Sequence, residues 1–348
     1  MTGLRRGAVV LAAALALAAP ARAESIDQLY QKAKAEGAVV LWAAGPTAGY
    51  EQAAKSFEAR FPGVAVSLTG GFSNVLNAKV VAQLEAKKVE TDVTVFQTVQ
   101  DFVAWDRRGW LMRWKPDGYA AVRAGFKAKD GSWIAVNANP LVYGYNIDNV
   151  KPADLPKSAL DFLKPEFAGK VVSAYPADDD ATLFDFYTIV QKYGWGYMAK
   201  YMAQKPTFIQ GHLSVARALG SGTAWVSFDN SIGSTENVKR EGGRIGLAWP
   251  QKDPVPVFFV SEAILKGAPH PNAAKLYVTW MLSKEQQGKG GGYSSRTDVP
   301  PPAGLPDLNK LKLADRYLAF VTDRAQLVAL RKRFESYSGP VTNTGGVK

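Results

Sequence analysis

Small polar residues recur directly after the apolar runs that we expect to be β-strands. The set combines hydroxyl, amide and aromatic side chains with a single acid. Such loops suit a small polar molecule held by many neutral hydrogen bonds, because each loop also offers free backbone N–H groups near a helix N-terminus. The candidate ligand-binding residues are Thr47, Phe72, Ser73, Asn74, Gln97, Tyr143, Tyr175, Thr182, Asp229 and Asn230.

Taken one at a time, several of these residues have simpler explanations. Ser73, Thr182 and Ser231 are also suited to cap helix N-termini. Tyr143 and Tyr175 are suited to stack on an organic ligand or to donate a phenol hydrogen bond, but equally to pack in a core or hinge. Only the repetition of the same kind of loop favours binding.

Three adjacent acids, Asp178, Asp179 and Asp180, form the sharpest charge feature. Because neighbouring carboxylates repel one another, we expect them to be solvated at a helix N-terminus, where the helix dipole favours negative charge. Together with Asp229 they leave two other roles open. One is contact with a cation or a polyamine. The other is acid and base catalysis in an exported hydrolase, by Asp179 or Asp180 with Asp229.

The usual signatures of enzymes and metal sites are missing from the sequence. It has no cysteine, no G-x-S-x-G, Walker or H-E-x-x-H motif, and two histidines, His212 and His270, which we expect in surface or capping positions. The glycine-rich run at 288–292 follows a predicted helix and is typical of a turn. We therefore expect no enzyme activity, no cofactor and no metal site.

The first 23 residues are typical of a secretory signal peptide. Arg5 and Arg6 precede a short uncharged apolar run, and a small-x-small cleavage site stands before Glu24. The apolar run is too short to span a membrane comfortably, and no cysteine is available for a lipid anchor. The net charge of +11 comes without a dense basic run. We expect a periplasmic monomer that binds no nucleic acid.

Strands and helices alternate through the first part of the chain, which predicts α/β lobes with mainly parallel sheets covered by helices. The predicted helices span 26–33, 50–61, 76–84, 99–108, 182–193, 322–338 and a segment that starts at Pro271. The predicted strands span 38–42, 64–68, 92–96, 133–137, 142–146, 171–175, 224–228, 245–249 and 257–265.

Two proline-containing segments divide the chain. Pro140 joins two predicted strands, and the proline-rich stretch 250–256 leads into another. We interpret both as connections between two lobes, a number of domains that also fits 348 residues. The expected division is a signal peptide over 1–23, lobe 1 over 24–140 and 255–348, and lobe 2 over 141–254.

The later part of the chain resembles the periplasmic solute-binding proteins of ABC importers, in the branch of ferric-iron, thiamine and phosphonate binders. The resemblance rests on K-G-A-P-H-P-N-A-A-K at 266–275, M-L-S-K-E-Q-Q at 281–287 and Y-S-S-R-T-D-V at 293–299. It implies a type 2 periplasmic-binding-protein fold, with two α/β lobes, two hinge crossovers and closure on a small-molecule ligand. It also implies delivery of that ligand to the membrane subunits of an ABC permease.

The ferric branch of that family has an adjacent tyrosine pair after the strand equivalent to 224–228. Here Asp229 and Asn230 follow that strand, and no histidine lies in the first ligand loop at 43–47. Ferric iron prefers hard anionic oxygen ligands such as phenolate, so the sequence favours an organic solute over iron.

The charge of the solute stays open at this point. The positive net charge and the helix N-termini favour an organic anion. The four aspartates favour a cation or a polyamine instead. Service to a chemoreceptor rather than to a transporter is a further alternative.

Overall fold

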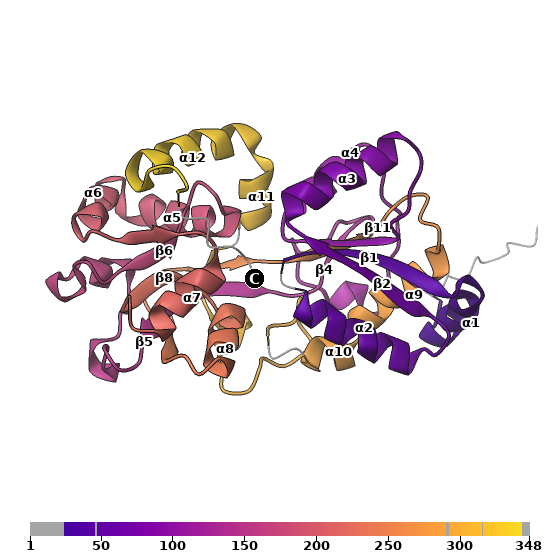
Figure 1. Ribbon diagram of the computed structural model, residues 1–348, viewed down its shortest axis with the longest axis horizontal. Coiled ribbons are helices and arrows are strands. Elements are labelled where there is room, and N and C mark those ends of the chain that lie inside the picture. Colours follow the sequence, from indigo (N-terminus) through magenta and orange to yellow (C-terminus); the bar gives the residue numbers. More distant parts are fainter. Residues whose placement is uncertain (1–23, 46, 290–291, 315, 343–348) are drawn as a thin grey trace, which may run out of the picture.

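Two lobes lie side by side in the computed structural model, which describes residues 24–45, 47–289, 292–314 and 316–342 (Figure 1). The predicted signal peptide falls outside these residues, as does part of the glycine-rich run at 288–292. Within the described ranges, no helix has the length and apolar character needed to cross a membrane.

Lobe 1 is built on a five-stranded sheet in the order β2-β1-β3-β11-β4. β1 runs parallel to β2 and β3, and β11 runs antiparallel to β3 and β4. Its strands are β1 (Ala38–Ala44), β2 (Ala65–Gly71), β3 (Val93–Phe96), β4 (Ile134–Ala135) and β11 (Ser261–Ile264). Its helices are α1 (Ile26–Glu36), α2 (Ala48–Arg60), α3 (Ser73–Glu85), α4 (Val99–Arg107), α9 (Pro271–Met281) and α10 (Lys284–Lys289).

Helices cover both faces of the lobe 1 sheet. Phe57 of α2 and Tyr277 of α9 meet in one core, with ring centroids 5.3 Å apart. Phe102 and Trp105 of α4 lie 5.2 Å apart in the other core. The helical spacing of apolar residues predicts which side of each helix packs against the sheet, because positions i, i+3 and i+4 share one side of a helix.

Lobe 2 is centred on β5, the strand that enters from lobe 1. β5 pairs antiparallel with β8, β9 and β10. The prediction of a mainly parallel sheet is therefore wrong for lobe 2. The strands are β5 (Asn139–Asn146), β8 (Val226–Ser231), β9 (Ile245–Ala248), β10 (Val255–Phe258) and β12 (Leu313–Ala314), beside the parallel pair β6 (Val172–Ala174) and β7 (Thr207–Ile209). The helices are α5 (Asp180–Tyr193), α6 (Gly196–Ala203), α7 (His212–Gly220) and α8 (Ile232–Arg240). Short 3₁₀ helices lie at Tyr119–Ala121, Pro152–Asp154, Ala159–Leu163, Pro165–Phe167 and Leu308–Lys310.

Two strand connections form the hinge. The first runs between β4 and β5, close to Pro140 as expected. The second differs from the expectation, because residues 257–265 are two strands. Phe258 pairs with Asn139 in lobe 2, whereas Ser261 pairs with Phe96 in lobe 1. The chain therefore crosses at 259–260 and not at Pro254.

The C-terminal helices leave lobe 1, where we expected all of 255–348. α11 (Tyr317–Thr322) lies between α4 of lobe 1 and α5 of lobe 2, and α12 (Arg324–Ser338) packs against α5 (Figure 1). Phe334 of α12 lies 5.5 Å from Phe186 of α5 and 5.0 Å from Trp195, measured between ring centroids. α5 is buried around most of its circumference, so it needs a helix on its outer side as well as the sheet beneath it.

Glu262 of β11 is a carboxyl group without a partner in the core of lobe 1. Its side chain is fully buried, and neither carboxyl oxygen has a hydrogen-bond partner. Burial raises the pKa of Glu262 well above its usual range, so the folded protein holds it as a neutral acid. The unfolded chain releases this proton near the ordinary glutamate pKa, and stability therefore falls as the pH rises above that value.

We expect Glu262→Gln to flatten this pH dependence, because a neutral amide of nearly the same shape has no proton to lose. The wild-type slope from this one group reaches at most about 1.4 kcal/mol per pH unit. Urea unfolding at pH 5 and pH 8 measures the slope. Glu335→Gln, at an exposed position of α12, is the control and should retain the wild-type slope. An unchanged slope in Glu262→Gln contradicts the prediction.

Candidate functional site

The two lobes touch through polar side chains at the N-terminal end of α5. Gln97, which follows β3 of lobe 1, donates from Nε2 to Asp179 Oδ2 at 3.3 Å. Gln100 of α4 donates from Nε2 to Asp180 Oδ2 at 2.7 Å. Both hydrogen bonds join lobe 1 to lobe 2, so the structure describes a closed arrangement of the lobes.

Asp229 of β8 is the most completely enclosed acid at this junction. It is fully buried, and its Oδ2 accepts hydrogen bonds from Ser173 Oγ at 3.2 Å, the Ala174 N–H at 3.0 Å and Thr182 Oγ1 at 3.1 Å. Burial raises the pKa of Asp229, and the neighbouring His212 partly offsets that effect. One carboxyl group thus ties β8 to β6 and α5.

His212, the first residue of α7, lies between two aspartates. Its Nε2 is 3.3 Å from Asp179 Oδ1, and its Nδ1 is 3.3 Å from Asp229 Oδ1. The second contact lacks hydrogen-bond geometry, so we describe it as an ion pair. Burial lowers the pKa of His212, but the two carboxylates outweigh burial and raise it to about 9. The ring is therefore a cation at neutral pH. It stacks on the ring of Phe258, with the two ring centroids 6.1 Å apart.

No pattern in the sequence indicates this position of His212, and the surface or capping position that we expected is wrong. β7, which leads to His212, is only three residues long and has no recognisable periodicity. Its parallel pairing with β6 brings the next loop beside Asp179. His270 does precede α9 as a capping residue, and its N–H donates to Asp92 Oδ1 at 2.7 Å.

The acidic run does lie at a helix N-terminus, as expected, but the expectation that all three acids are solvated is wrong, because Asp180 is buried. Asp179 is the N-cap of α5, and its Oδ1 accepts from the N–H groups of Ala181 and Thr182 at 2.8 and 2.9 Å. Although burial acts to raise the pKa of Asp179, His212 and these donors bring it below its usual range. The cap satisfies N–H groups that a bound anion would otherwise use.

The other two acids of the run also have protein donors. Asp180 accepts from Gln100 and from Arg331 of α12. Asp178 is exposed and accepts from Gln210 Nε2 at 2.8 Å. The protein's own groups therefore engage every acid of this cluster.

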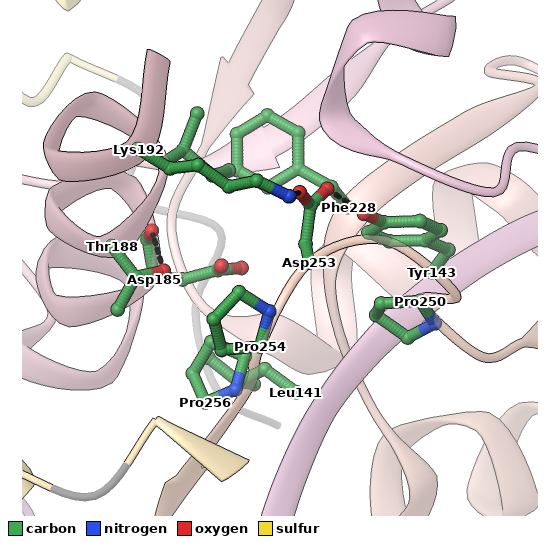
Figure 2. Close-up of a pocket in the computed structure, with 11 residues that line it drawn as sticks. Leu141, Tyr143, Asp185, Thr188, Lys192, Phe228, Pro250, Asp253, Pro254 and Pro256 are labelled. Atoms are coloured by element: carbon green, nitrogen blue, oxygen red, sulfur yellow. Dashed lines mark hydrogen bonds and ion pairs between the residues drawn. The ribbon is translucent and has the colours of Figure 1, made fainter. Parts of the chain in front are cut away.

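Two candidate residues turn away from the junction. Asn230 is fully buried, and its Nδ2 donates to Thr235 Oγ1 at 2.6 Å inside lobe 2. Tyr143 lies on the hinge side of β5 and donates to Asp253 Oδ2 at 2.8 Å (Figure 2). Sequence alone identifies the strand but not which face of it meets the other lobe.

The remaining candidates lie at strand ends on either lobe. Thr47 begins α2, and its hydroxyl donates to Glu51. Phe72 precedes α3 with its ring 61% exposed, and Ser73 and Asn74 open that helix. Tyr175 is buried after β6, with its hydroxyl 3.4 Å from Thr342 Oγ1 in the C-terminal segment. Of the ten candidates, the structure joins Gln97, Thr182 and Asp229 in one network around Asp179.

α3 and α7 start without side-chain caps. Neither helix has an acidic residue in its first turn, and α7 begins with the His212 cation. The first N–H groups of such helices have no intrahelical partner. They are suited to hydrogen-bond an anionic group.

No metal centre is preassembled in the part of the chain that the structure describes. There, no group of three or more His, Asp or Glu residues is arranged to hold a metal ion. Asp229 and Asn230 stand where the ferric branch has its tyrosine pair, and both side chains are already engaged inside lobe 2. The preference for an organic solute over iron stays a prediction.

Two α/β lobes that share two hinge strands and meet through polar loops define a type 2 periplasmic-binding-protein fold. Residues 52–312 match the family of bacterial extracellular solute-binding proteins, and the chain belongs to this family. Such proteins bind a small ligand and deliver it to an ABC permease, and they are not enzymes. The hydrolase alternative based on Asp179 or Asp180 with Asp229 therefore has no support.

Relatives of known identity agree with this assignment. The chain is 24% identical over 290 residues to an Fe(3+)-binding periplasmic protein of Serratia marcescens, a match that covers 80% of each chain. It is also similar to iron-bound HitA of Pseudomonas aeruginosa, with a TM-score of 0.72, 19% identity, and coverage of 85% of this chain and 99% of that one. AfuA of Actinobacillus pleuropneumoniae, with fructose-6-phosphate bound, gives a TM-score of 0.67 at 21% identity, over 86% and 98% of the two chains.

Proposed function

We propose that this protein captures a small polar organic solute with at least one acidic group and delivers it to the membrane subunits of an ABC permease. In this proposal it is exported by the signal peptide at 1–23, carries no lipid anchor and works as a periplasmic monomer. Lobe closure at the α5 junction retains the solute, since ligand binding favours the state in which both lobes contribute contacts.

One observation carries the preference for an anion: protein groups already engage the aspartates at the junction, and the one buried oxygen of theirs that accepts no hydrogen bond from the described residues, Asp229 Oδ1, lies beside the His212 cation. Asp179 caps α5 and pairs with His212, and Asp229 accepts three hydrogen bonds. Asp180 is held by two donors. A cationic solute needs a free carboxylate, and these have to give up protein partners first. The acidic residues thus offer less to a polyamine than the sequence alone suggests.

The cationic His212 and the uncapped starts of α3 and α7 support the same preference. The exposed ring of Phe72 beside α3 offers an apolar surface for the organic part of a solute. Among the similar structures, one contains a sugar phosphate and another contains iron. An organic phosphate or carboxylate fits the donors of this chain, whereas iron lacks the phenolate pair.

A thermal-shift panel of organic phosphates, organic acids, polyamines and ferric citrate tests the proposal. At a hundredfold excess over its Kd, a ligand adds about 2.7 kcal/mol, which corresponds to a Tm rise of about 4 °C for a chain of this size. We expect such a rise with an organic phosphate or carboxylate, and a smaller radius of gyration in scattering if the free protein opens. A rise with spermidine or ferric ion alone contradicts the anion proposal. No rise with any compound contradicts solute capture itself.

A further inference from the structure

A small enclosed pocket lies inside lobe 2, beside the strands β5 and β10 that continue into the two hinge crossings and away from the junction between the lobes. Its volume is about 10 Å³, close to the space that one water molecule needs. Figure 2 shows it between α5, the strand β5 and the connection that leads into β10. It is lined by Leu141, Tyr143, Asp185, Thr188, Ile189, Lys192, Phe228, Pro250, Asp253, Pro254 and Pro256.

Asp185 of α5 points into this pocket (Figure 2). The residue is only 4% exposed, and its Oδ2 has no hydrogen-bond partner among the residues that the structure describes. The nearby Thr188 hydroxyl does not serve it, because that hydroxyl donates to the backbone carbonyl of Asp185 at 2.8 Å. A buried oxygen without a hydrogen-bond partner costs free energy. A donor from outside the chain, bound in the pocket, therefore stabilises Asp185.

The second carboxyl group of the pocket, Asp253, is by contrast fully engaged. Its Oδ2 accepts from Tyr143 Oη at 2.8 Å and from the Ala159 N–H at 2.6 Å, and its Oδ1 accepts from Lys192 Nζ at 2.6 Å and from Tyr193 Oη at 2.5 Å. These four donors come from β5, a 3₁₀ helix and α5. Asp253 therefore fixes the segment that leads into β10 to β5 and to α5, on the lobe 2 side of the two crossings. We call these five residues the hinge clamp.

The charges around Asp185 disfavour a second anion at this place. Asp229 of β8 and Asp253 both raise the pKa of Asp185, whereas the cation of His212 on α7 acts to lower it. Lys192 also lines the pocket but is already paired with Asp253. Asp185 also acts to raise the pKa of Tyr143 on β5 and of Tyr197 and Tyr201 on α6.

We propose that Asp185 is a neutral carboxylic acid that binds one water molecule in this hinge pocket, beside the hinge clamp. The water completes the hydrogen bonding of the orphaned oxygen, and the neutral acid leaves Asp253 as the only carboxylate that the clamp donors face. Burial and the two neighbouring aspartates, which raise the pKa of Asp185 well above its usual range, agree with this geometry. The inference concerns the hinge and stands whichever solute the protein carries.

Loss of the Asp185 proton has a direct consequence for the hinge. A carboxylate at Asp185 brings a second negative charge beside Asp253 and competes with it for Lys192 and Tyr143. Because the folded state holds a proton that the unfolded state releases near the ordinary aspartate pKa, this group's contribution to stability is full below that value. It is lost as the pH rises through the higher folded pKa.

Two measurements test the two parts of the proposal. The infrared difference spectrum between wild type and Asp185→Asn at neutral pH should contain the carbonyl band of a protonated carboxylic acid, which shifts in D₂O. Carboxylate bands in that difference overturn the neutral acid. Asp154→Asn, at an exposed position in the same lobe, is the matched control and should give carboxylate bands only.

The water is tested by a high-resolution crystal structure of the wild-type protein. We expect one ordered water within hydrogen-bond distance of Asp185 Oδ2, and an empty pocket overturns this part of the proposal. Asp185→Leu should lose the water, because it keeps a similar volume without a polar atom. If that variant does not fold, the wild-type density and the infrared difference of Asp185→Asn still decide both parts.

Discussion

Replacement of Asp229 by alanine is expected to destabilise the folded protein by about 3–5 kcal/mol, the range for removal of one member of a buried, paired charge network. Three donors then lose their common acceptor: the Ser173 hydroxyl, the Ala174 N–H and the Thr182 hydroxyl. The His212 cation also loses one of its two carboxylates. Since Asp229 is fully buried, water cannot replace these contacts without opening lobe 2.

Urea unfolding, followed by circular dichroism at neutral pH, measures this loss. Asp178→Ala is the matched control, because Asp178 belongs to the same acidic cluster but is exposed and accepts only from Gln210. We expect the control to change stability by less than about 1 kcal/mol. Asp229→Asn should fall between the two, since it retains one acceptor oxygen but removes the charge that faces His212. Equal effects of Asp229→Ala and Asp178→Ala contradict this account of the network.

The regular part of lobe 1 was predictable because its pattern is local. From α1 to α4, apolar residues repeat at helical spacing, and short apolar runs lie between them. Each helix buries one stripe against the sheet, so the sequence alone determines both its existence and its inner face. The same reasoning placed the acidic run at the start of α5, where Asp179 is the N-cap.

The errors arise where long-range pairing decides the structure. The run from Val257 to Leu265 is apolar apart from Ser261 and Glu262 and long enough for one strand, yet its two halves pair with strands of different lobes. Nothing in its periodicity marks that change of partner. The position of α12 is equally non-local. α12 covers the aromatic side of α5, a helix that lies more than a hundred residues earlier in the chain.

The polar network at the lobe junction was predictable in part for the same reason. Strand ends identified Gln97, Thr182 and Asp229, because polar residues after a strand lie at the edge of the sheet. Tyr143 was misplaced since alternate residues of β5 face opposite sides, and its hydroxyl serves the hinge clamp. His212 was missed because its role depends on two aspartates that lie 33 and 17 positions away in the sequence.

Titration of His212 should show a pKa of about 9 in the folded protein, raised from 6.5 by Asp229 and Asp179 against the opposing effect of burial. The raised pKa corresponds to about 3 kcal/mol of stability. The sign follows from linkage: the contribution is full below pH 6.5, where both states are protonated, and is lost as the pH rises through about 9. The chain has only two histidines, so proton NMR of a His270→Gln variant without a tag isolates the His212 resonance.

Urea unfolding across the same range separates this group from the two buried acids. Glu262 and Asp185 also lose stabilising protons as the pH rises, so the measurement compares His212→Gln with its parent in the background of Glu262→Gln and Asp185→Asn. We expect the parent to lose about 3 kcal/mol more than His212→Gln between pH 6.5 and pH 10. A histidine resonance that titrates near 6.5, or equal losses in both proteins, means that the ring is not an ion-pair partner of Asp179 and Asp229. In that case the cationic part of the proposed anion site is also absent.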